Sequence, residues 1–248
     1  KLNKYDVVSG DFVKTLFEEK SDKYVEPLDP MYFIPNNNNQ FLWFSQRDGY
    51  RHLYLYDIDG KLLKQVTSGN WVVYDIIGFD NKSNNVFIYT AKDSPIEKHI
   101  YAVDLKNNKL RKLSNDKGTH RAKFNTAGTF FIDTYSNLEV PVRVNIVDNK
   151  GKVVDVLHED LETLSHLQMP KTEIFTIQNQ GVDLYCRIIK PADFDPLKKY
   201  PVMIYVYGGP HAQMITESWL GGAGLFLNYF AQQGYIVFTL DNRGTANR

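Results

Sequence analysis

Hydrophobic and polar positions alternate in short segments through the first two thirds of the chain. Three stretches share one order: an apolar run, a second run that ends in aspartate, a turn, and a third run. The leading apolar runs are residues 41–46, 86–90 and 130–134. The aspartates that close the second runs are Asp57, Asp104 and Asp148, at intervals of 47 and 44 positions. Short segments separated by Asn, Asp or Gly in this way predict antiparallel β-strands.

One more strand is expected ahead of each apolar run. These strands are predicted near residues 31–34, 74–79 and 121–124. Four antiparallel strands at a period of about 44 residues are typical of a β-propeller blade. Residues 5–16 repeat only the end of the unit, so further blades are expected upstream, because a ring needs roughly four to eight. A β-sandwich whose strand spacing repeats by chance is the alternative.

The repeat ends near Ser165. Residues 172–177 and 182–189 flank Asn179-Gln180-Gly181, which predicts a hairpin with glycine where a positive φ is required. The continuous apolar run over 201–207 predicts a strand that is covered on both faces, as in parallel sheets.

A helix is expected after that strand, over residues 225–233, with Gly234 just beyond its end. A buried strand over 235–240 then completes a strand–helix–strand crossover. The chain therefore predicts a mixed fold. Residues 1–165 would be the C-terminal blades of a β-propeller, and residues 166–248 would begin an α/β domain.

Charge and composition narrow the possible partners. Lys and Arg together number 29, as do Asp and Glu, so the formal net charge is zero and neither nucleic acid nor an anionic membrane surface is expected as a partner. Residues 218–240 carry no charge, but Asn228, Gln232 and Gln233 inside this stretch favour a helix and a buried strand over a membrane span. The single cysteine, Cys186, excludes an intrachain disulfide.

No metal or cofactor site is predicted. The histidines are expected to be surface or turn residues, because they are scattered without the spacing of metal ligands. They are His52, His99, His120, His158, His166 and His211.

The search for a nucleophile gives a loop rather than a serine. None of the serines lies in G-x-S-x-G, the turn that presents the nucleophile of α/β-hydrolases. Tyr207-Gly208-Gly209-Pro210 instead follows the predicted third strand, where such enzymes carry donors to the oxyanion. A core aromatic at a strand end is the alternative for Tyr207.

Four segments carry a resemblance to a known family. They are residues 45–57, 205–213, 229–240 and 241–248. They resemble the prolyl oligopeptidase family of serine peptidases, and within it the dipeptidyl peptidase IV branch, which includes prolyl tripeptidyl peptidases. The likeness extends over nearly the whole chain, which is read as an internal fragment of a longer enzyme.

The resemblance implies an N-terminal β-propeller joined to a C-terminal α/β-hydrolase domain that cleaves peptides after proline with Ser, Asp and His. It implies that the Tyr207 hydroxyl stabilises the oxyanion and that Gly208, Gly209 and Pro210 shape the loop. Arg243 is expected to be a structural anchor. The catalytic triad and the acidic pair that captures the substrate amine would lie outside this segment, so the fragment alone is expected to be inactive.

Partners and location are expectations on the same basis. Short proline-containing peptides would be the substrates, no cofactor would be needed, the full-length form would be a homodimer, and the enzyme would be periplasmic or secreted. Di- and tripeptide release are not distinguished. Two alternatives stay open: a non-catalytic propeller scaffold with a degenerate hydrolase domain, and an acylaminoacyl peptidase or oligopeptidase of the same fold.

Overall fold

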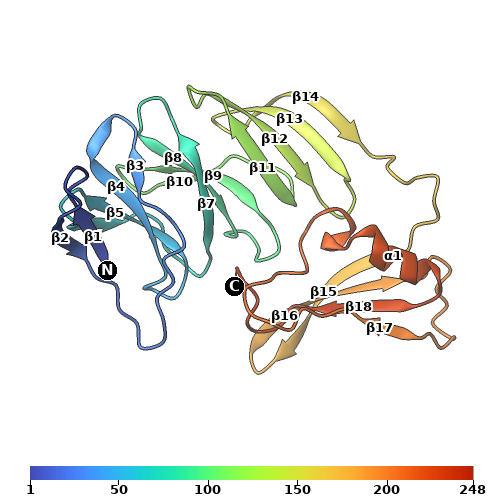
Figure 1. Cartoon of the computed structure of the whole chain (residues 1–248). Coiled ribbons are helices and arrows are strands. Elements are labelled where there is room, and N and C mark those ends of the chain that lie inside the picture. Colours follow the sequence, from blue (N-terminus) through green and yellow to red (C-terminus); the bar gives the residue numbers. More distant parts are fainter. Residues whose placement is uncertain (248) are drawn as a thin grey trace.

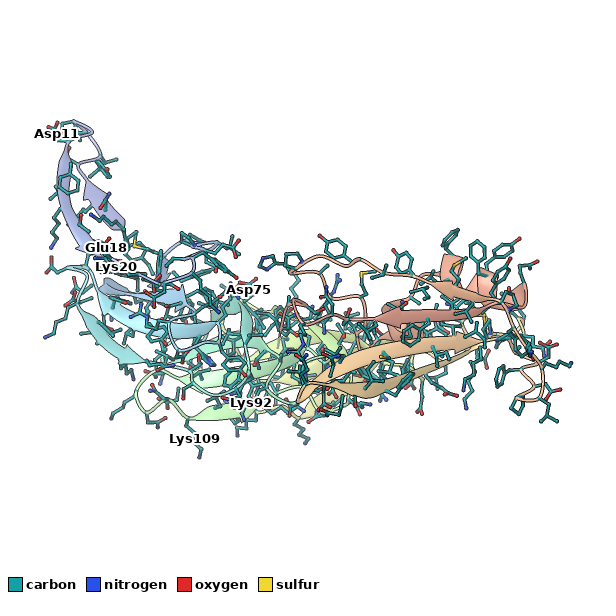
Figure 2. The ribbon with its side chains drawn as sticks, turned by 90° about the horizontal axis from the view of Figure 1, so that it is seen from below. Asp11, Glu18, Lys20, Asp75, Lys92 and Lys109 are labelled. Carbon is teal, nitrogen blue, oxygen red and sulfur yellow. The ribbon has the colours of Figure 1, made fainter. Side chains whose placement is uncertain are left out.

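The computed structural model describes residues 1–247 and arranges them as five β-sheets along the chain (Figure 1). The first sheet is a hairpin of β1 (Leu2–Tyr5) and β2 (Phe12–Phe17). It projects from the rest of the molecule with Asp11 at its tip (Figure 2). Three antiparallel sheets of four strands and one mixed sheet follow, so the fold is mostly β.

The three antiparallel sheets, called blades 1, 2 and 3, pair their strands in chain order. Blade 1 contains β3 (Tyr32–Ile34), β4 (Asn37–Ser45), β5 (His52–Asp57) and β6 (Leu62–Gln65). Blade 2 contains β7 (Val73–Phe79), β8 (Asn85–Thr90), β9 (His99–Asp104) and β10 (Leu110–Lys112). Blade 3 contains β11 (Thr119–Phe124), β12 (Phe130–Ser136), β13 (Val142–Asp148) and β14 (Val153–Asp160). The strands expected ahead of each apolar run are confirmed as β3, β7 and β11.

The repeating aspartates form the turns between the third and fourth strands. Asp57, Asp104 and Asp148 each accept two backbone N–H bonds from the turn that follows, at 2.7 to 3.1 Å. After Asp57 the turn needs glycine at Gly60, because φ is +89° and a Cβ there would lie 2.4 Å from the Leu16 carbonyl oxygen. The repeat therefore depends on contacts between residues that are close in the sequence, which explains why the sequence pattern reveals it.

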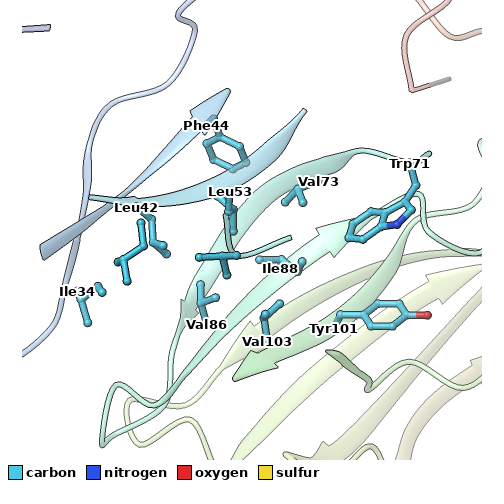
Figure 3. Close-up of a cluster of buried hydrophobic side chains, with 12 residues drawn as sticks. Ile34, Leu42, Phe44, Leu53, Trp71, Val73, Val86, Ile88, Tyr101 and Val103 are labelled. Atoms are coloured by element: carbon cyan, nitrogen blue, oxygen red, sulfur yellow. The ribbon is translucent and has the colours of Figure 1, made fainter. Parts of the chain in front are cut away.

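Buried side chains join each blade to the next. One cluster lies between blades 1 and 2 and includes Leu42, Leu53, Val86 and Ile88 (Figure 3). A second cluster joins blade 2 to blade 3, where the Phe87 ring stacks on Phe124 at 4.0 Å and Phe124 contacts Phe131. Each such side chain contributes about 1.5–3 kcal/mol by leaving water.

The expectation that all six histidines are surface or turn residues is wrong for three of them. His52, His99 and His120 are fully buried within the blades. His52 Nδ1 lies 3.0 Å from Thr67 Oγ1, and His99 Nδ1 lies 2.8 Å from Ser114 Oγ. Burial of an imidazole is tolerated here because both ring nitrogens have partners.

His120 is bonded on both sides in the same way. Its Nδ1 faces the Asp133 carboxylate at 2.9 Å and its Nε2 faces the Asp116 carbonyl at 2.8 Å. The other three histidines, His158, His166 and His211, are exposed as expected.

The mixed sheet at the end of the chain contains four strands in the order β15-β16-β18-β17. Their bounds are β15 (Lys171–Asn179), β16 (Val182–Lys190), β17 (Val202–Ile204) and β18 (Ile236–Leu240). β15, β16 and β18 pair antiparallel, whereas β17 and β18 are parallel and are joined through a short 3-10 helix, η1 (Trp219–Gly222), and helix α1 (Leu225–Gln232). The predicted hairpin and crossover are therefore confirmed.

Helix α1 ends as the sequence predicts. Gly234 has φ +88°, its N–H donates to the Ala231 carbonyl at 3.0 Å, and the Tyr235 N–H donates to the Phe230 carbonyl at 3.2 Å. These two bonds and the contact between the Phe230 and Tyr235 rings form a Schellman cap. Within residues 1–247 no helix is long and apolar enough to span a bilayer.

The strand predicted over 201–207 is shorter and more open than expected. β17 stops at Ile204, and Val202 and Ile204 are 58% and 69% exposed. The reason is its place in the sheet: in the described chain β17 pairs with β18 alone, so one edge and much of its surface face solvent. An apolar run identifies a strand but does not show how far its neighbours extend.

Candidate active site

Tyr207 lies on the loop that leaves the carboxyl end of β17. The Tyr205 N–H still donates to the Phe238 carbonyl of β18 at 2.9 Å, and beyond this bond the chain departs from the sheet. The Tyr207 side chain is 60% exposed. Among the described residues its hydroxyl makes no hydrogen bond, so this donor is free to meet a ligand.

The two positions after Tyr207 favour glycine for different structural reasons. Gly208 has φ +74°, a conformation that favours glycine. Gly209 lies under the Tyr207 ring, and a Cβ there would be 2.8 Å from the ring Cε1. Gly209 therefore allows the Tyr207 ring to lie close against the backbone.

The segment after β18 braces this loop. The His211 N–H donates to the Gly244 carbonyl at 2.9 Å, and the Asn242 side-chain amide reaches the Gly209 carbonyl at 3.5 Å. Gly244 also packs against Pro210, since a Cβ there would lie 3.5 Å from the Pro210 Cα. The loop is thus held from behind while the phenol of Tyr207 faces outward.

Arg243 of the same segment turns away from the loop. Its Nε and Nη2 donate to the Asn179 side-chain oxygen at 3.1 and 2.9 Å, at the turn between β15 and β16. This contact agrees with the structural role expected of Arg243.

A second set of contacts ties the loop region to blades 2 and 3. Glu217 is buried, and its carboxylate lies 2.9 Å from Lys117 Nζ and accepts the Leu138 N–H at 3.4 Å. Its backbone N–H donates to the Ile96 carbonyl at 2.7 Å, and its carbonyl accepts the Thr119 hydroxyl at 3.0 Å. The hydrogen bond to Glu217 raises the pKa of Lys117. One residue therefore makes four bonds across the seam between blades and mixed sheet.

Two cavities of the described chain lie in different parts of the molecule. The larger, about 560 Å³, lies between the connector 19–29 and the turn between β4 and β5. Its two arginines are paired with carboxylates, Arg47 with Glu19 and Arg51 with Asp29, both at 2.6 Å. The smaller, about 190 Å³, lies beside α1 and is lined in part by Arg187 and Tyr205.

No metal centre is formed by the described part of the chain. Over residues 1–247, no group of three or more His, Cys, Asp or Glu side chains is placed to hold a metal ion. Cys186 is buried in β16 and forms no disulfide.

The site residues taken from the sequence thus lie together on one loop. Tyr207, Gly208, Gly209 and Pro210 form its first half, and residues 241–244 support it. The support by Asp241 and by Arg187 of β16 was not predicted, because it depends on contacts between strands that are distant in the sequence.

Comparison with known proteins gives the family. Residues 1–142 match the Dipeptidyl peptidase IV (DPP IV) N-terminal region. The chain is 30% identical over 237 residues to dipeptidyl peptidase 4 of Trichophyton rubrum, covering 91% of this chain and 30% of that protein. The chain therefore spans about a third of the length of the curated relatives it matches.

Solved structures give the same likeness. A structure from Bacteroides ovatus that is assigned to dipeptidyl aminopeptidase IV is 37% identical, with a TM-score of 0.91 over 99% of this chain and 38% of that chain. Porphyromonas gingivalis dipeptidyl peptidase 4 is 32% identical, with a TM-score of 0.83 over 95% of this chain and 34% of that chain. The chain belongs to the dipeptidyl peptidase IV family.

Proposed function

We propose that this chain is part of a serine-type peptidase that releases di- or tripeptides after proline from the N-terminus of short peptides. One observation carries the proposal: a free, exposed tyrosine hydroxyl lies on a braced loop after the third strand of the mixed sheet. The names of the relatives, dipeptidyl peptidase 4 and dipeptidyl aminopeptidase IV, support a peptidase of this kind.

The proposal includes the division of the chain. Residues 1–165 would be propeller blades that admit peptides by size, and residues 166–248 would begin an α/β-hydrolase domain. Three four-stranded antiparallel sheets before Leu161, and a parallel β17–α1–β18 crossover after Lys171, support this division. A homodimer and a periplasmic or secreted location belong to the same proposal.

Tyr207 would act on the charge that forms during the reaction. When a serine attacks the carbonyl after proline, the carbonyl oxygen becomes an oxyanion. The Tyr207 O–H would donate to that oxygen together with a backbone N–H beside the serine. A donor fixed before the charge develops contributes about 10²–10³ in rate, because it needs no reorganisation at the moment of reaction. The serine, aspartate and histidine would come from parts of the parent protein outside these 248 residues.

The test is kinetic and uses the full-length enzyme with a chromogenic peptide that ends in proline. Tyr207→Phe should lower kcat by at least about tenfold with little change in KM, because the lost bond forms fully only in the transition state. Tyr229→Phe is the matched control, since Tyr229 is another exposed tyrosine but lies on α1. An unchanged kcat in Tyr207→Phe would remove the assignment. A full-length protein without peptidase activity would favour the scaffold.

A further inference from the structure

Two buried, oppositely charged side chains lie behind the loop that carries Tyr207. Arg187 is in β16 and is 1% exposed, and Asp241 follows β18 and is 2% exposed. The Asp241 N–H donates to the Tyr185 carbonyl at 3.0 Å, which fixes it beside the strand of Arg187. Ionised groups are rarely buried so completely unless their bonds are specified.

Arg187 of β16 connects the segment 214–221 and β18 through one guanidinium. Its Nη1 donates to the Met214 carbonyl at 2.8 Å and to the Gly221 carbonyl at 2.7 Å, and its Nη2 donates to Thr239 Oγ1 at 3.1 Å. Gly221 makes room for it, because a Cβ there would lie 3.1 Å from Arg187 Cδ. The guanidinium therefore joins both ends of the segment 214–221 to β18.

Asp241 holds the same segment from the other side of the peptide. One carboxylate oxygen accepts the Met214 N–H at 2.9 Å, and the other accepts the Ile215 N–H at 3.2 Å. Met214 is thus fixed at both of its backbone groups, its N–H by Asp241 and its carbonyl by Arg187. Hydrogen bonds to charged groups are about twice as strong as neutral ones, so this clamp is a firm one.

The Asp241 charge offsets part of the cost of burying Arg187. Burial lowers the pKa of Arg187, and the nearby Asp241 charge raises it. Burying two ions costs several kcal/mol each before their interactions offset it, so apolar side chains could stabilise the strands at lower cost. The charged pair instead fixes the position of the Met214 backbone relative to β16 and β18.

This clamp closes one end of the loop that includes Tyr207. At the other end, Tyr205 is bonded to Phe238 of β18. Residues 206–213 run between these fixed points and are held again at Gly209 and His211 by the segment after β18, and Tyr207 lies near the first point. Because a displacement of about 1 Å at a catalytic group can cost about 10²-fold in rate, fixed loop ends would matter for the hydroxyl.

We propose that Arg187 and Asp241 are positioning residues that hold the loop 205–214 so that the Tyr207 hydroxyl meets the oxyanion. The proposal rests on the proposed function. It assigns no contact between either side chain and the substrate.

The test is a double-mutant cycle in the full-length enzyme. Asp241→Asn removes one of the two acceptor contacts and should lower kcat at least about fivefold, with KM within about twofold. In the Tyr207→Phe background the same change should lower kcat less than about twofold, because the group that it positions is already gone. Arg187→Met should behave in the same way, and Arg187→Lys, which keeps the charge, should restore part of kcat.

Lys190→Gln is the matched control. Lys190 lies on the same strand as Arg187, and the change removes its ion pair with Glu173 without altering a contact of the loop. The kcat should therefore stay within about twofold of wild type. Hydrogen exchange on the wild-type enzyme gives a second measurement that does not depend on folding of the variants. The Met214 and Ile215 amides should exchange slowly, as expected for amides bonded to a buried carboxylate.

The outcomes separate the two proposals. Equal losses of kcat from Asp241→Asn in both backgrounds, or fast exchange at the Met214 and Ile215 amides, would overturn the positioning role and leave the function of Tyr207 intact. A Tyr207→Phe enzyme with unchanged kcat would overturn the oxyanion role, and the positioning role with it.

Discussion

Two blade tyrosines and Tyr207 of the loop after β17 differ in what surrounds their hydroxyls. In blade 1 the Tyr56 hydroxyl accepts a bond from Arg47 at 2.7 Å, and in blade 2 the Tyr101 hydroxyl donates to Asp93 at 2.8 Å. Burial and the Asp93 contact raise the pKa of Tyr101. Tyr207 in the C-terminal region has an exposed hydroxyl with no partner in the described chain.

This difference in hydrogen bonding distinguishes groups that stabilise the fold from a group that is available to a ligand. In the blades, the buried imidazoles and the hydroxyls of Tyr56 and Tyr101 are bonded to neighbouring groups and fix the positions of strands, whereas the buried Tyr54 hydroxyl makes no hydrogen bond in the described chain. In the short loop after β17, the Tyr207 hydroxyl makes no hydrogen bond within the described chain, while buried neighbours hold the backbone of the loop. A polar group next to a rigid support, rather than a polar group as such, marks the candidate site.

The largest expected effect contrasts a blade core with the exposed edge. Phe131→Ala removes a buried ring between blades 2 and 3, and should lower the free energy of unfolding of the 1–248 chain by about 3–5 kcal/mol. Ile204→Ala, on exposed β17, should change it by no more than about 0.5 kcal/mol. Equilibrium denaturation of both variants measures the difference.

Similar losses for the two variants in this chain would contradict the contrast, and would mean that β17 is as well covered as the blades. If Ile204→Ala becomes costly only in the full-length protein, the contrast is sharpened, because the cover of β17 would then come from residues beyond this segment.

A medium effect is expected from the histidine contacts of blades 1 and 2. Thr67→Val removes the hydroxyl that His52 Nδ1 and the Leu53 N–H share, and Ser114→Ala does the same to His99 Nδ1 and the Ile100 N–H. Each change should cost about 1–3 kcal/mol, the usual penalty for an unsatisfied buried group.

Thermal unfolding measures both variants, and Thr176→Val on exposed positions of β15 is the control, with a change within about 0.5 kcal/mol. Costs that differ strongly between the two blades would show that the contacts are not equivalent.

These histidines also show where sequence reasoning stops. Each blade turn could be predicted because Asp57 and its counterparts bond residues only two to four positions away. The partner of His52 lies 15 positions on, across a strand pair, and the same interval separates His99 from Ser114. The spacing of 47 between the two histidines equals that between Asp57 and Asp104, and this signal was available in the sequence.

The candidate site divides in the same way. Tyr207 and its glycines could be located from the sequence, because the strand, the loop and the family resemblance are local patterns. Arg187 and Asp241 could not, because their role depends on the order β16-β18 in the sheet and on the return of Met214 to both strands. The early end of β17 was missed for a related reason, since strand length depends on the neighbouring strand.

The smallest expected effect is a pH dependence in the mixed sheet. Hydrogen bonds from Lys190 and Lys171, at 2.9 and 3.0 Å, lower the pKa of Glu173. A lowered pKa in the folded state gives stability that is present above the ordinary value and lost as the pH falls through the folded value. Glu173→Gln should therefore lower Tm by about 2 °C at pH 6, and by less as the pH approaches 3.

Melting curves of wild type and Glu173→Gln across this pH range test the effect, with the exposed Glu162→Gln as control. A difference in Tm that stays constant with pH would contradict the role of the carboxylate charge.

The fixed interval between His52 and Thr67, repeated between His99 and Ser114, has a consequence for how such chains can change length. An insertion between the histidine and its hydroxyl partner would pull the two apart, whereas the connection ahead of the histidine is free of that constraint. Insertions and deletions among relatives should therefore be rare between the histidine and its hydroxyl partner, in residues 53–66 and 100–113.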